Sequence, residues 1–453
     1  MSETSPHDRP RIAVLGGGSA GEMLADLIGN DAEVLVFEPG LVGGECPFLA
    51  CMPSKAMLHE AAAGTDWSDA IARRDEITDH RDDSSHAADL VDHGATLIRE
   101  RAVIDGPGAI VAGGTRYAVD HIVVATGADP IRPPLDGAEE FAEFVWTSED
   151  LYRATERPDR VVIVGGGVIG FESAEVFSRF GSTVTVVDEV DRPFDSLPEA
   201  VGVTVQEALE GRGVRFRFGS GAAAIHPEPD GPGVLVELES GERFAADRIL
   251  LAVGRRPRTE DIGLESLGLD PTEPLPVGPT GRVDSSGSLW AMGDVAGLGQ
   301  YTHLANHQAK VIADHLLAGG ERRFDDVVLA SCVFTDPPLI QVGDWATVTD
   351  SSNDSSNDDI VIATKDLASF PRASTDRLGP GYLAVAASRR SGNCRGGRRC
   401  RRPLRRVGPR PRDRHRRGVQ VARLAQSMQP FPTVGEILGP IWQDLAEQLT
   451  AGA

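Results

Sequence analysis

Two stretches of the chain share the same order of apolar and polar segments. Residues 11–15 form a run that is apolar after Arg11 and precedes a glycine-rich turn, and a helical pattern then continues through Ile28. A second apolar run, residues 33–37, ends at the acidic Glu38. An apolar run, a glycine turn, a helical period and a second apolar run are typical of a βαβ unit with parallel strands.

The same order recurs further along the chain. Residues 160–164 form a run that is apolar after Arg160 and precedes a second glycine-rich turn, and the later run 183–187 ends at Asp188. Each turn has the spacing G-x-G-x-x-G between strand and helix, which lets a pyrophosphate approach the backbone at the start of the helix. The acid that ends the second strand is placed to bond a ribose hydroxyl. Two units therefore predict two bound dinucleotides, with glycines at Gly16, Gly18, Gly21, Gly165, Gly167 and Gly170.

A pair of cysteines, Cys46 and Cys51, lies between the two units in a motif that runs from Gly43 to Lys55. The chain has only five cysteines, far fewer than a secreted disulfide scaffold of this length would use. The spacing alone also fits two buried small side chains, or half of a zinc site. No second Cys/His cluster in the sequence would complete a zinc site, so we expect no metal.

The glycines before this cysteine pair and the Pro-Ser-Lys after it, together with the nucleotide motifs, resemble the redox-active signature of class I pyridine nucleotide-disulfide oxidoreductases. This is the family of lipoamide dehydrogenase, glutathione reductase and mercuric reductase. The resemblance implies an α/β fold with two Rossmann-like dinucleotide-binding domains and a C-terminal α+β interface (dimerisation) domain. The implied limits are 11–147 and 271–323 for a discontinuous FAD domain, 148–270 for the NAD(P) domain and 324–453 for the interface domain.

The resemblance also implies a route for the electrons. Hydride passes from the nicotinamide to FAD, and the flavin then reduces the Cys46/Cys51 disulfide. Cys51 matches the thiol nearest the flavin, and Cys46 matches the interchange thiol that meets the acceptor. Lys55 and Glu172 match the pair near the reactive nitrogen of the flavin. The chain has only three lysines, which favours a functional role for Lys55 over that of a surface cation.

Shorter strings extend the resemblance to other cofactor contacts. Gly254 lies in a string like the family's return crossing toward the FAD part, near the NAD. Asp188 would repel the 2′-phosphate of NADP(H), so NAD(H) is expected and NADP(H) is less favoured. The nearby Arg192 could weaken that preference. The other expected contacts are Glu38, Gly44, Lys55, Thr126, Gly127, Asp294 and Thr302 for FAD, and Ile169 for NAD.

The C-terminal part departs from the family. Disulfide-reducing members carry a His-Pro-Thr string followed by a glutamate, and the histidine acts as the acid and base. Phe431 stands in the place of that histidine here, while Glu436 is retained and stays a catalytic candidate. Because a phenyl ring cannot carry a proton, an NADH-dependent quinone or small-electrophile (mercuric-ion-type) reductase is an alternative. The extra C-terminal cysteine pair of mercuric reductases is missing.

The segment 389–423 is a second departure, with fifteen arginines and a single acid, Asp413. We interpret it as a local shift of reading frame, natural or introduced in sequencing. A disordered basic loop and an anion-binding arm are the competing interpretations. A disrupted interface would give a third class of function, a flavin-binding protein without turnover. Retention of both cysteines of the pair, with Lys55 and Glu172, argues against it.

Charge and hydropathy restrict the partners. A net charge of −23 over 453 residues argues against general binding to nucleic acid. The sequence has no apolar run near the roughly 20 residues that span a membrane, and residues 1–10 lack the apolar core of a signal peptide. We therefore expect a cytoplasmic homodimer without membrane contacts, acting on a small-molecule or protein-borne disulfide or other electron acceptor.

Overall fold

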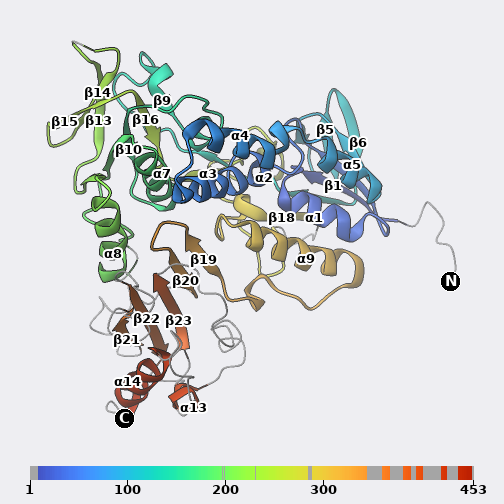
Figure 1. The fold of residues 1–453 in the computed structure, drawn as a ribbon. Coiled ribbons are helices and arrows are strands. Elements are labelled where there is room, and N and C mark those ends of the chain that lie inside the picture. The colour runs from blue at the N-terminus through green and yellow to red at the C-terminus, as the bar shows by residue number, and fades with distance from the viewer. Residues whose placement is uncertain are drawn as a thin grey trace.

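The structure is a computed structural model, and Figure 1 shows its fold. It is dominated by two parallel sheets and an antiparallel C-terminal sheet. The described residues are 9–195, 197, 199–229, 231–283, 288–343, 360–367, 381–388, 394–400, 420–425 and 437–450.

The first sheet has five parallel strands in the order β18-β7-β1-β2-β3. Strand β18 comes from much later in the chain but pairs with β7, which is the arrangement that a discontinuous domain requires. Its strands are β1 (Arg11–Leu15), β2 (Glu33–Phe37), β3 (Ala95–Ile98), β7 (His121–Val124) and β18 (Leu289–Ala291).

The second sheet repeats this plan, with the order β12-β11-β10-β16-β9 and parallel pairing throughout. Both predicted βαβ units are therefore present, and the prediction of two Rossmann-like α/β domains is confirmed. The exact domain limits remain a prediction. The strands of this sheet are β9 (Val145–Trp146), β10 (Arg160–Val164), β11 (Thr183–Val187), β12 (Arg215–Arg217) and β16 (Arg248–Leu251).

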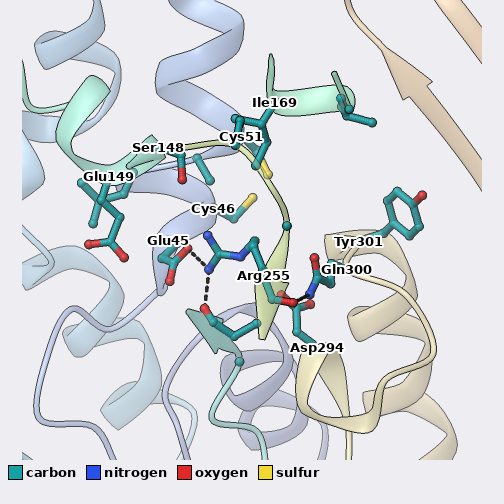
Figure 2. Close-up of a pocket in the computed structure, with 18 of the residues that line it drawn as sticks. Glu45, Cys46, Cys51, Ser148, Glu149, Ile169, Arg255, Asp294, Gln300 and Tyr301 are labelled. Atoms are coloured by element: carbon teal, nitrogen blue, oxygen red, sulfur yellow. Dashed lines mark hydrogen bonds and ion pairs between the residues drawn. The ribbon is translucent and has the colours of Figure 1, made fainter. Parts of the chain in front are cut away.

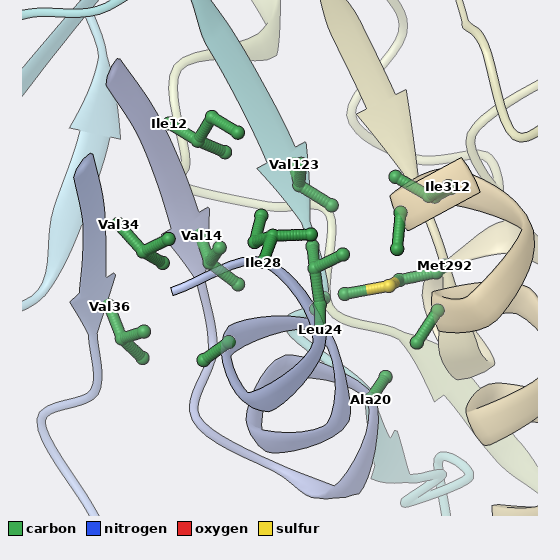
Figure 3. Close-up of a cluster of buried hydrophobic side chains, with 14 of the residues drawn as sticks. Ile12, Val14, Ala20, Leu24, Ile28, Val34, Val36, Val123, Met292 and Ile312 are labelled. Atoms are coloured by element: carbon green, nitrogen blue, oxygen red, sulfur yellow. The ribbon is translucent and has the colours of Figure 1, made fainter. Parts of the chain in front are cut away.

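The helices pack against these sheets through apolar faces. In the first unit, Leu24 and Ile28 lie one helical turn apart on α1 and meet Val14 of β1 in a cluster that excludes water (Figure 3). Each such side chain contributes about 1.5–3 kcal/mol by leaving water. The helices are α1 (Ser19–Ile28), α2 (Glu45–Phe48), α3 (Cys51–Ala63), α4 (Trp67–Ile77), α5 (Ser84–Asp92), α6 (Ser148–Leu151), α7 (Val168–Arg179), α8 (Glu199–Glu210) and α9 (Thr302–Ala318).

Smaller antiparallel sheets complete the nucleotide-binding part. Strands β8 (Ala128–Pro130) and β17 (Arg255–Pro257) pair with each other where the chain passes between the two large sheets. Of the two three-stranded sheets, β13-β14-β15 flanks the second parallel sheet (Figure 1). The remaining strands are β4 (Ala102–Ile104), β5 (Ala109–Ala112), β6 (Thr115–Ala118), β13 (Ala222–Pro227), β14 (Val234–Leu238) and β15 (Arg243–Ala246).

The C-terminal strands, orange to red in Figure 1, form one antiparallel sheet in the order β19-β20-β23-β22-β21. Helix α8 contacts two of these strands. No helix in the described part of the chain is long and apolar enough to cross a membrane. The elements are β19 (Ala330–Val333), β20 (Leu339–Val342), β21 (Ile360–Asp366), β22 (Tyr382–Ser388), β23 (Cys394–Cys400), α13 (Val421–Ala425) and α14 (Leu438–Thr450).

Strand β23 belongs to the arginine-rich segment 389–423. Its backbone pairs on both sides, with β20 and with β22, so a basic loop is the wrong interpretation for residues 394–400. The ladder hydrogen bonds of a strand come from the backbone, which is why an arginine-rich sequence can supply them. Apart from these residues and 420–423, the segment lies outside the described residues, and the shift of reading frame remains a hypothesis.

Candidate active site

A cavity of ≈ 2010 Å³ extends from one glycine turn to the other and passes the cysteine pair. A pocket for one small ligand measures about 300–1,000 Å³, so this cavity has room for more than one ligand. Most of the residues predicted from the sequence line it: Gly18, Glu38, Gly44, Cys46, Cys51, Lys55, Thr126, Gly127, Gly165, Gly167, Ile169, Glu172, Asp188, Gly254, Asp294 and Thr302.

The predicted residues that do not line the cavity fall into two groups. Gly16, Gly21 and Gly170 belong to the glycine turns but are not among the lining residues. Glu436 and Phe431 lie outside the described residues, so their expected roles stay predictions.

The first glycine of each turn adopts a backbone conformation that other residues rarely take. Gly16 has φ of +110° and Gly165 has φ of +114°. A side chain at either position would also collide with a backbone carbonyl of the next strand in the sheet, that of Ala125 or Ala252. Both turns therefore need glycine for conformation and for space.

In both units, the acid that follows the second strand accepts a hydrogen bond from the backbone of the glycine turn. Glu38 accepts a hydrogen bond from the N–H of Gly17 at 2.8 Å, and Asp188 accepts one from the N–H of Gly166 at 2.5 Å. Each carboxylate is thereby fixed beside its glycine turn, at the edge where the ribose of a dinucleotide is expected.

Both cysteine side chains contact the side chain of Thr302. Cys46 lies in the short helix α2, Cys51 is the first residue of α3, and Thr302 is the first residue of α9. The Thr302 hydroxyl donates to Cys46 Sγ at 3.2 Å, and its Oγ1 lies 3.6 Å from Cys51 Sγ. Figure 2 shows the two sulfur atoms close together in the cavity.

A hydrogen bond between the two thiols moves their pKa values apart. A hydrogen bond from Cys46 lowers the pKa of Cys51 to about 6, and the Thr302 hydroxyl and the charge of Lys55 act in the same direction. The same hydrogen bond, followed by burial, raises the pKa of Cys46 well above its usual range. At neutral pH the reduced pair therefore holds its thiolate on Cys51 and its proton on Cys46.

Lys55 and Glu172 form an ion pair on the wall of the cavity. Lys55 Nζ lies 2.8 Å from Glu172 Oε2, and Glu172 is only 4% exposed. The other Glu172 oxygen accepts the backbone N–H of Phe334 at 3.0 Å, and Lys55 Nζ lies 4.6 Å from the centre of the Phe334 ring. One buried carboxylate thus connects α3, α7 and the segment after β19.

Glu45 forms a second ion-paired group that the sequence reasoning missed. Its carboxylate lies 2.5 Å from Arg255 (Figure 2) and 2.7 Å from Arg258, and Arg258 also pairs with Asp129 at 2.5 Å. Burial raises the pKa of the nearby Asp294. The available signal was an acid directly before Cys46 and a run of arginines in the return crossing, but only the fold shows that they meet.

The crossing between the two parallel sheets fixes the other predicted contacts. The Thr126 hydroxyl donates to the carbonyl of Arg258 at 2.6 Å, so it connects the two crossing segments. Gly127 and Gly254, at the ends of those segments, have φ of +79° and +118°. Glycine at these positions lets both backbones pass beside the cavity.

Cys332 stands in the string Ala-Ser-Cys-Val, a pattern that predicts a strand residue in the core, and the structure bears out only the strand. It does lie in a strand, β19, but its side chain is only half-buried and lines the cavity. Burial raises its pKa to about 12, which keeps it a thiol at neutral pH. Among the described residues, no group of three or more His, Cys, Asp and Glu side chains is placed to hold a metal ion.

Comparison with known proteins agrees with this geometry. The family model for pyridine nucleotide-disulphide oxidoreductase matches residues 10–309. A dihydrolipoyl dehydrogenase of Pseudomonas aeruginosa is 30% identical over 83% of this chain and 85% of its own length. A dihydrolipoyl dehydrogenase of Haloferax volcanii is 29% identical over 84% of both chains.

Solved structures resemble the whole architecture. An HOCl-induced flavoprotein disulfide reductase from Escherichia coli, RclA, superposes with a TM-score of 0.82 at 25% identity, over 96% of this chain and 99% of that one. The fold of LpdA from Mycobacterium tuberculosis is also similar, with a TM-score of 0.80 at 24% identity and the same coverage.

Proposed function

The chain belongs to the class I pyridine nucleotide-disulfide oxidoreductase family. We propose that it uses Cys46 and Cys51 as a dithiol that passes electrons from NADH, through FAD, to an outside acceptor. The observation that carries this proposal is the shared contact of both sulfur atoms with Thr302, inside one cavity that runs between the two glycine turns.

Members of this family bind FAD and NAD(P)H, and the first unit of this chain is suited to FAD. When bound, these cofactors supply the hydride chemistry that no side chain provides. The turn presents open backbone to a pyrophosphate at Gly18, where an added Cβ would meet only Gly44 Cα at 3.8 Å, and Glu38 is fixed for a ribose. Gly44, Lys55, Thr126, Gly127, Asp294 and Thr302 are the other residues that would hold FAD.

The second unit would hold NAD(H). A Cβ added at Gly167 would meet nothing within 4 Å, so this turn leaves space for a pyrophosphate. Asp188 supports a preference for NADH, because a fixed carboxylate disfavours a 2′-phosphate. Gly165, Ile169, Gly170 and Gly254 are the remaining residues that we assign to this dinucleotide.

The dithiol reaction follows from the split acidity of the two cysteines. Once Cys46 loses its proton, its sulfur attacks one sulfur of an acceptor disulfide, and a mixed disulfide forms as the acceptor's own S–S bond breaks. The first acceptor thiolate leaves and takes up a proton. Cys51, already a thiolate, then attacks Cys46 Sγ and closes the Cys46–Cys51 disulfide, and the second acceptor sulfur leaves as a thiolate that takes up a proton from water.

Lys55 and Glu172 would act as positioning residues beside this reaction. Their buried ion pair fixes the start of α3, which carries Cys51, against α7 of the second unit. A charge so close to Cys51 also favours its thiolate form. We keep Glu436 as a candidate of the C-terminal part on sequence grounds alone.

The domain division supports this scheme. We propose an FAD domain at 11–147 and 271–323, an NAD(P) domain at 148–270 and an interface domain from 324 onward. The pairing of β18 with β7 and of β8 with β17 supports the two crossings on which that division depends. We also propose a homodimer, as is typical of the family.

The acceptor is proposed as a disulfide of the lipoamide type. The relatives named dihydrolipoyl dehydrogenase and flavoprotein disulfide reductase share a disulfide or dithiol chemistry, which supports that class. Phe431, in the place of the family's histidine, favours the second candidate, a quinone or small-electrophile reductase that needs no proton transfer there.

Turnover assays with NADH separate these functions. Lipoamide, glutathione disulfide and a soluble quinone serve as acceptors, with Cys46→Ser, Cys51→Ser and, as a matched thiol control in the same cavity, Cys332→Ser. The proposal expects disulfide turnover that both variants of the pair lose and the control keeps. Quinone turnover that survives Cys46→Ser, without disulfide turnover in the parent protein, would establish the second candidate instead.

A further inference from the structure

Three carboxylates gather where the cavity reaches the end of β11. Asp188 and Glu189 follow that strand, and Glu239 follows β14, at the start of the turn to β15. All three line the cavity, together with Gly221. The chain thus brings two acids from one loop and a third from a separate hairpin to the rim of the proposed nicotinamide-dinucleotide site.

Glu239 is anchored rather than free to swing away. Its carboxylate accepts the N–H of Gly221 at 3.3 Å, and its own N–H donates to the carbonyl of Gly221 at 2.9 Å. Gly221 also separates it from Glu189. A Cβ built at Gly221 would lie 3.6 Å from Glu189 Cβ and 3.6 Å from Glu239 Oε2, so the two acidic side chains flank one glycine.

The basic residue nearest in sequence does not offset these charges. Arg192 donates to the backbone carbonyls of Phe194, Asp195 and Leu197, the last at 2.8 Å, so its guanidinium is engaged by its own loop. The expectation that Arg192 could weaken the preference for NADH therefore finds no support in its geometry.

The other cations of the cavity wall are also engaged elsewhere. Among the described lining residues, Lys55 pairs with Glu172, whereas Arg255 and Arg258 share Glu45. Arg153 approaches Glu149 at 3.9 Å. None of these partners belongs to the loop of Asp188 or to the hairpin of Glu239.

We propose that Glu239 is a second residue that selects NADH over NADPH, acting from a hairpin outside the βαβ unit that carries Asp188. This inference rests on the proposed function, in which the second unit holds the adenosine half of the nicotinamide dinucleotide. A 2′-phosphate carries close to two negative charges at neutral pH and would enter a rim with three carboxylates, of which those of Asp188 and Glu239 are held by hydrogen bonds. NADH, which has a hydroxyl there, meets hydrogen-bond acceptors instead.

The test compares Glu239→Gln with Glu242→Gln in the full-length protein with its bound flavin. Glu242 lies in the same hairpin but pairs with Arg217 and does not line the cavity, so its removal changes the net charge equally. NAD⁺ and NADP⁺ are titrated onto each protein by calorimetry. The same titrations in 0.5 M salt report whether the difference is electrostatic.

The parent protein should bind NAD⁺ more tightly, and Glu239→Gln should tighten NADP⁺ relative to NAD⁺ by about fivefold for each unit charge on the phosphate at 4 Å in water. High salt should shrink that change, and Glu242→Gln should leave the ratio near that of the parent. Glu239→Arg should move the ratio further in the same direction.

An unchanged ratio in Glu239→Gln and Glu239→Arg, with NAD⁺ still bound, would overturn this inference and leave the proposed function intact. An equal change in Glu242→Gln would overturn it too, because general charge would then be the cause. Failure of the parent protein to bind either nucleotide would instead remove the proposed function and this inference together.

Discussion

Apart from the two cysteines, Thr302 is the residue that most affects the pKa values of the dithiol. Its hydroxyl contacts both sulfur atoms and helps to lower the pKa of Cys51. A thiolate beside an oxidised flavin gives a long-wavelength thiolate-to-flavin absorbance band. Because Cys51 is a thiolate above its pKa of about 6, this band of the reduced protein should be present at neutral pH and lost as the pH falls through about 6.

Thr302→Val should raise that midpoint, because the variant removes the hydroxyl that lies 3.6 Å from Cys51 Sγ and can turn to donate to it when Cys51 is a thiolate. The absorbance of the anaerobically reduced protein, titrated from pH 8 to pH 5, measures it. Thr302→Ser keeps a hydroxyl and should titrate like the parent. A Thr302→Val midpoint equal to that of the parent would show that the hydroxyl does not act on Cys51.

Glu172 offers a prediction for the ion pair. Glu172→Gln keeps an oxygen for the N–H of Phe334 but loses the charge that holds Lys55, so the start of α3 should be less well fixed. Misplacement of a reacting group by about 1 Å can cost roughly 10²-fold, and we expect the passage of electrons from the flavin to the Cys46/Cys51 pair to slow by about tenfold or more.

Rapid-mixing spectroscopy gives that rate, and Glu175→Gln on the same helix provides the control, since Glu175 pairs with Arg179 and Arg212 and does not line the cavity. Equal rates in the parent and Glu172→Gln would remove the positioning role of this ion pair.

At the scale of single residues, the sequence could predict chemistry that resides in local motifs. Cys46, Cys51 and the two strand-end acids are recognisable because spacing along the chain specifies them. The ion pairs of Glu45 could not be predicted in the same way, because Arg255 and Arg258 are far from Glu45 in the sequence and only the fold brings them together. The position of Cys332 on the cavity wall could not be predicted either, because the alternation of side chains along a strand does not say which face borders a cavity.

At the scale of elements, the two glycine turns allow the two dinucleotides to be separated. Gly16→Ala and Gly165→Ala place the same clash in equivalent turns. A strained backbone of this kind costs about 1–3 kcal/mol, which corresponds to a roughly 5- to 150-fold loss of affinity. We expect Gly16→Ala to lose flavin and Gly165→Ala to keep flavin but bind NADH weakly.

Flavin absorbance of the purified variants and NADH titration measure both affinities, and each variant is the control for the other. Loss of flavin in Gly165→Ala with retention in Gly16→Ala would reverse the assignment of the two units.

Helix α1 carries a stability prediction. Leu24 is fully buried against the first sheet, so Leu24→Ala should lower the free energy of unfolding by about 2–5 kcal/mol. Leu27 lies on the same helix with 38% of its surface exposed, and Leu27→Ala should change it by less than about 0.5 kcal/mol. Denaturant unfolding of the flavin-loaded proteins makes the comparison, and similar losses in both variants would contradict the packing described for α1.

Elements with a strong periodic pattern were the ones that the sequence could predict. The strands at 11–15, 33–37, 160–164 and 183–187 occur as expected, because apolar runs that end at a glycine turn or an acid have few alternative structures. Strand β23 could not be predicted from its arginines, since its place is set by the backbones of β20 and β22 on either side.

At the scale of the whole molecule, the proposed homodimer is open to a direct measurement. Light scattering of the purified protein should give about twice the chain mass of 48.1 kDa. A monomer would favour the alternative in which a disrupted C-terminal part leaves a flavin-binding protein without turnover, and the arginine-rich segment 389–423 would be the first place to look for the cause.

In the proposed function, NADH, flavin and the Cys46/Cys51 pair form one electron path. An anaerobic titration of the purified protein with NADH, followed by absorbance and repeated with Cys51→Ser, tests it most directly. We predict a long-wavelength band that grows with NADH in the parent and is absent in the variant. Bleaching of the flavin without that band, in parent and variant alike, would show that the cysteines take no part and would contradict the account.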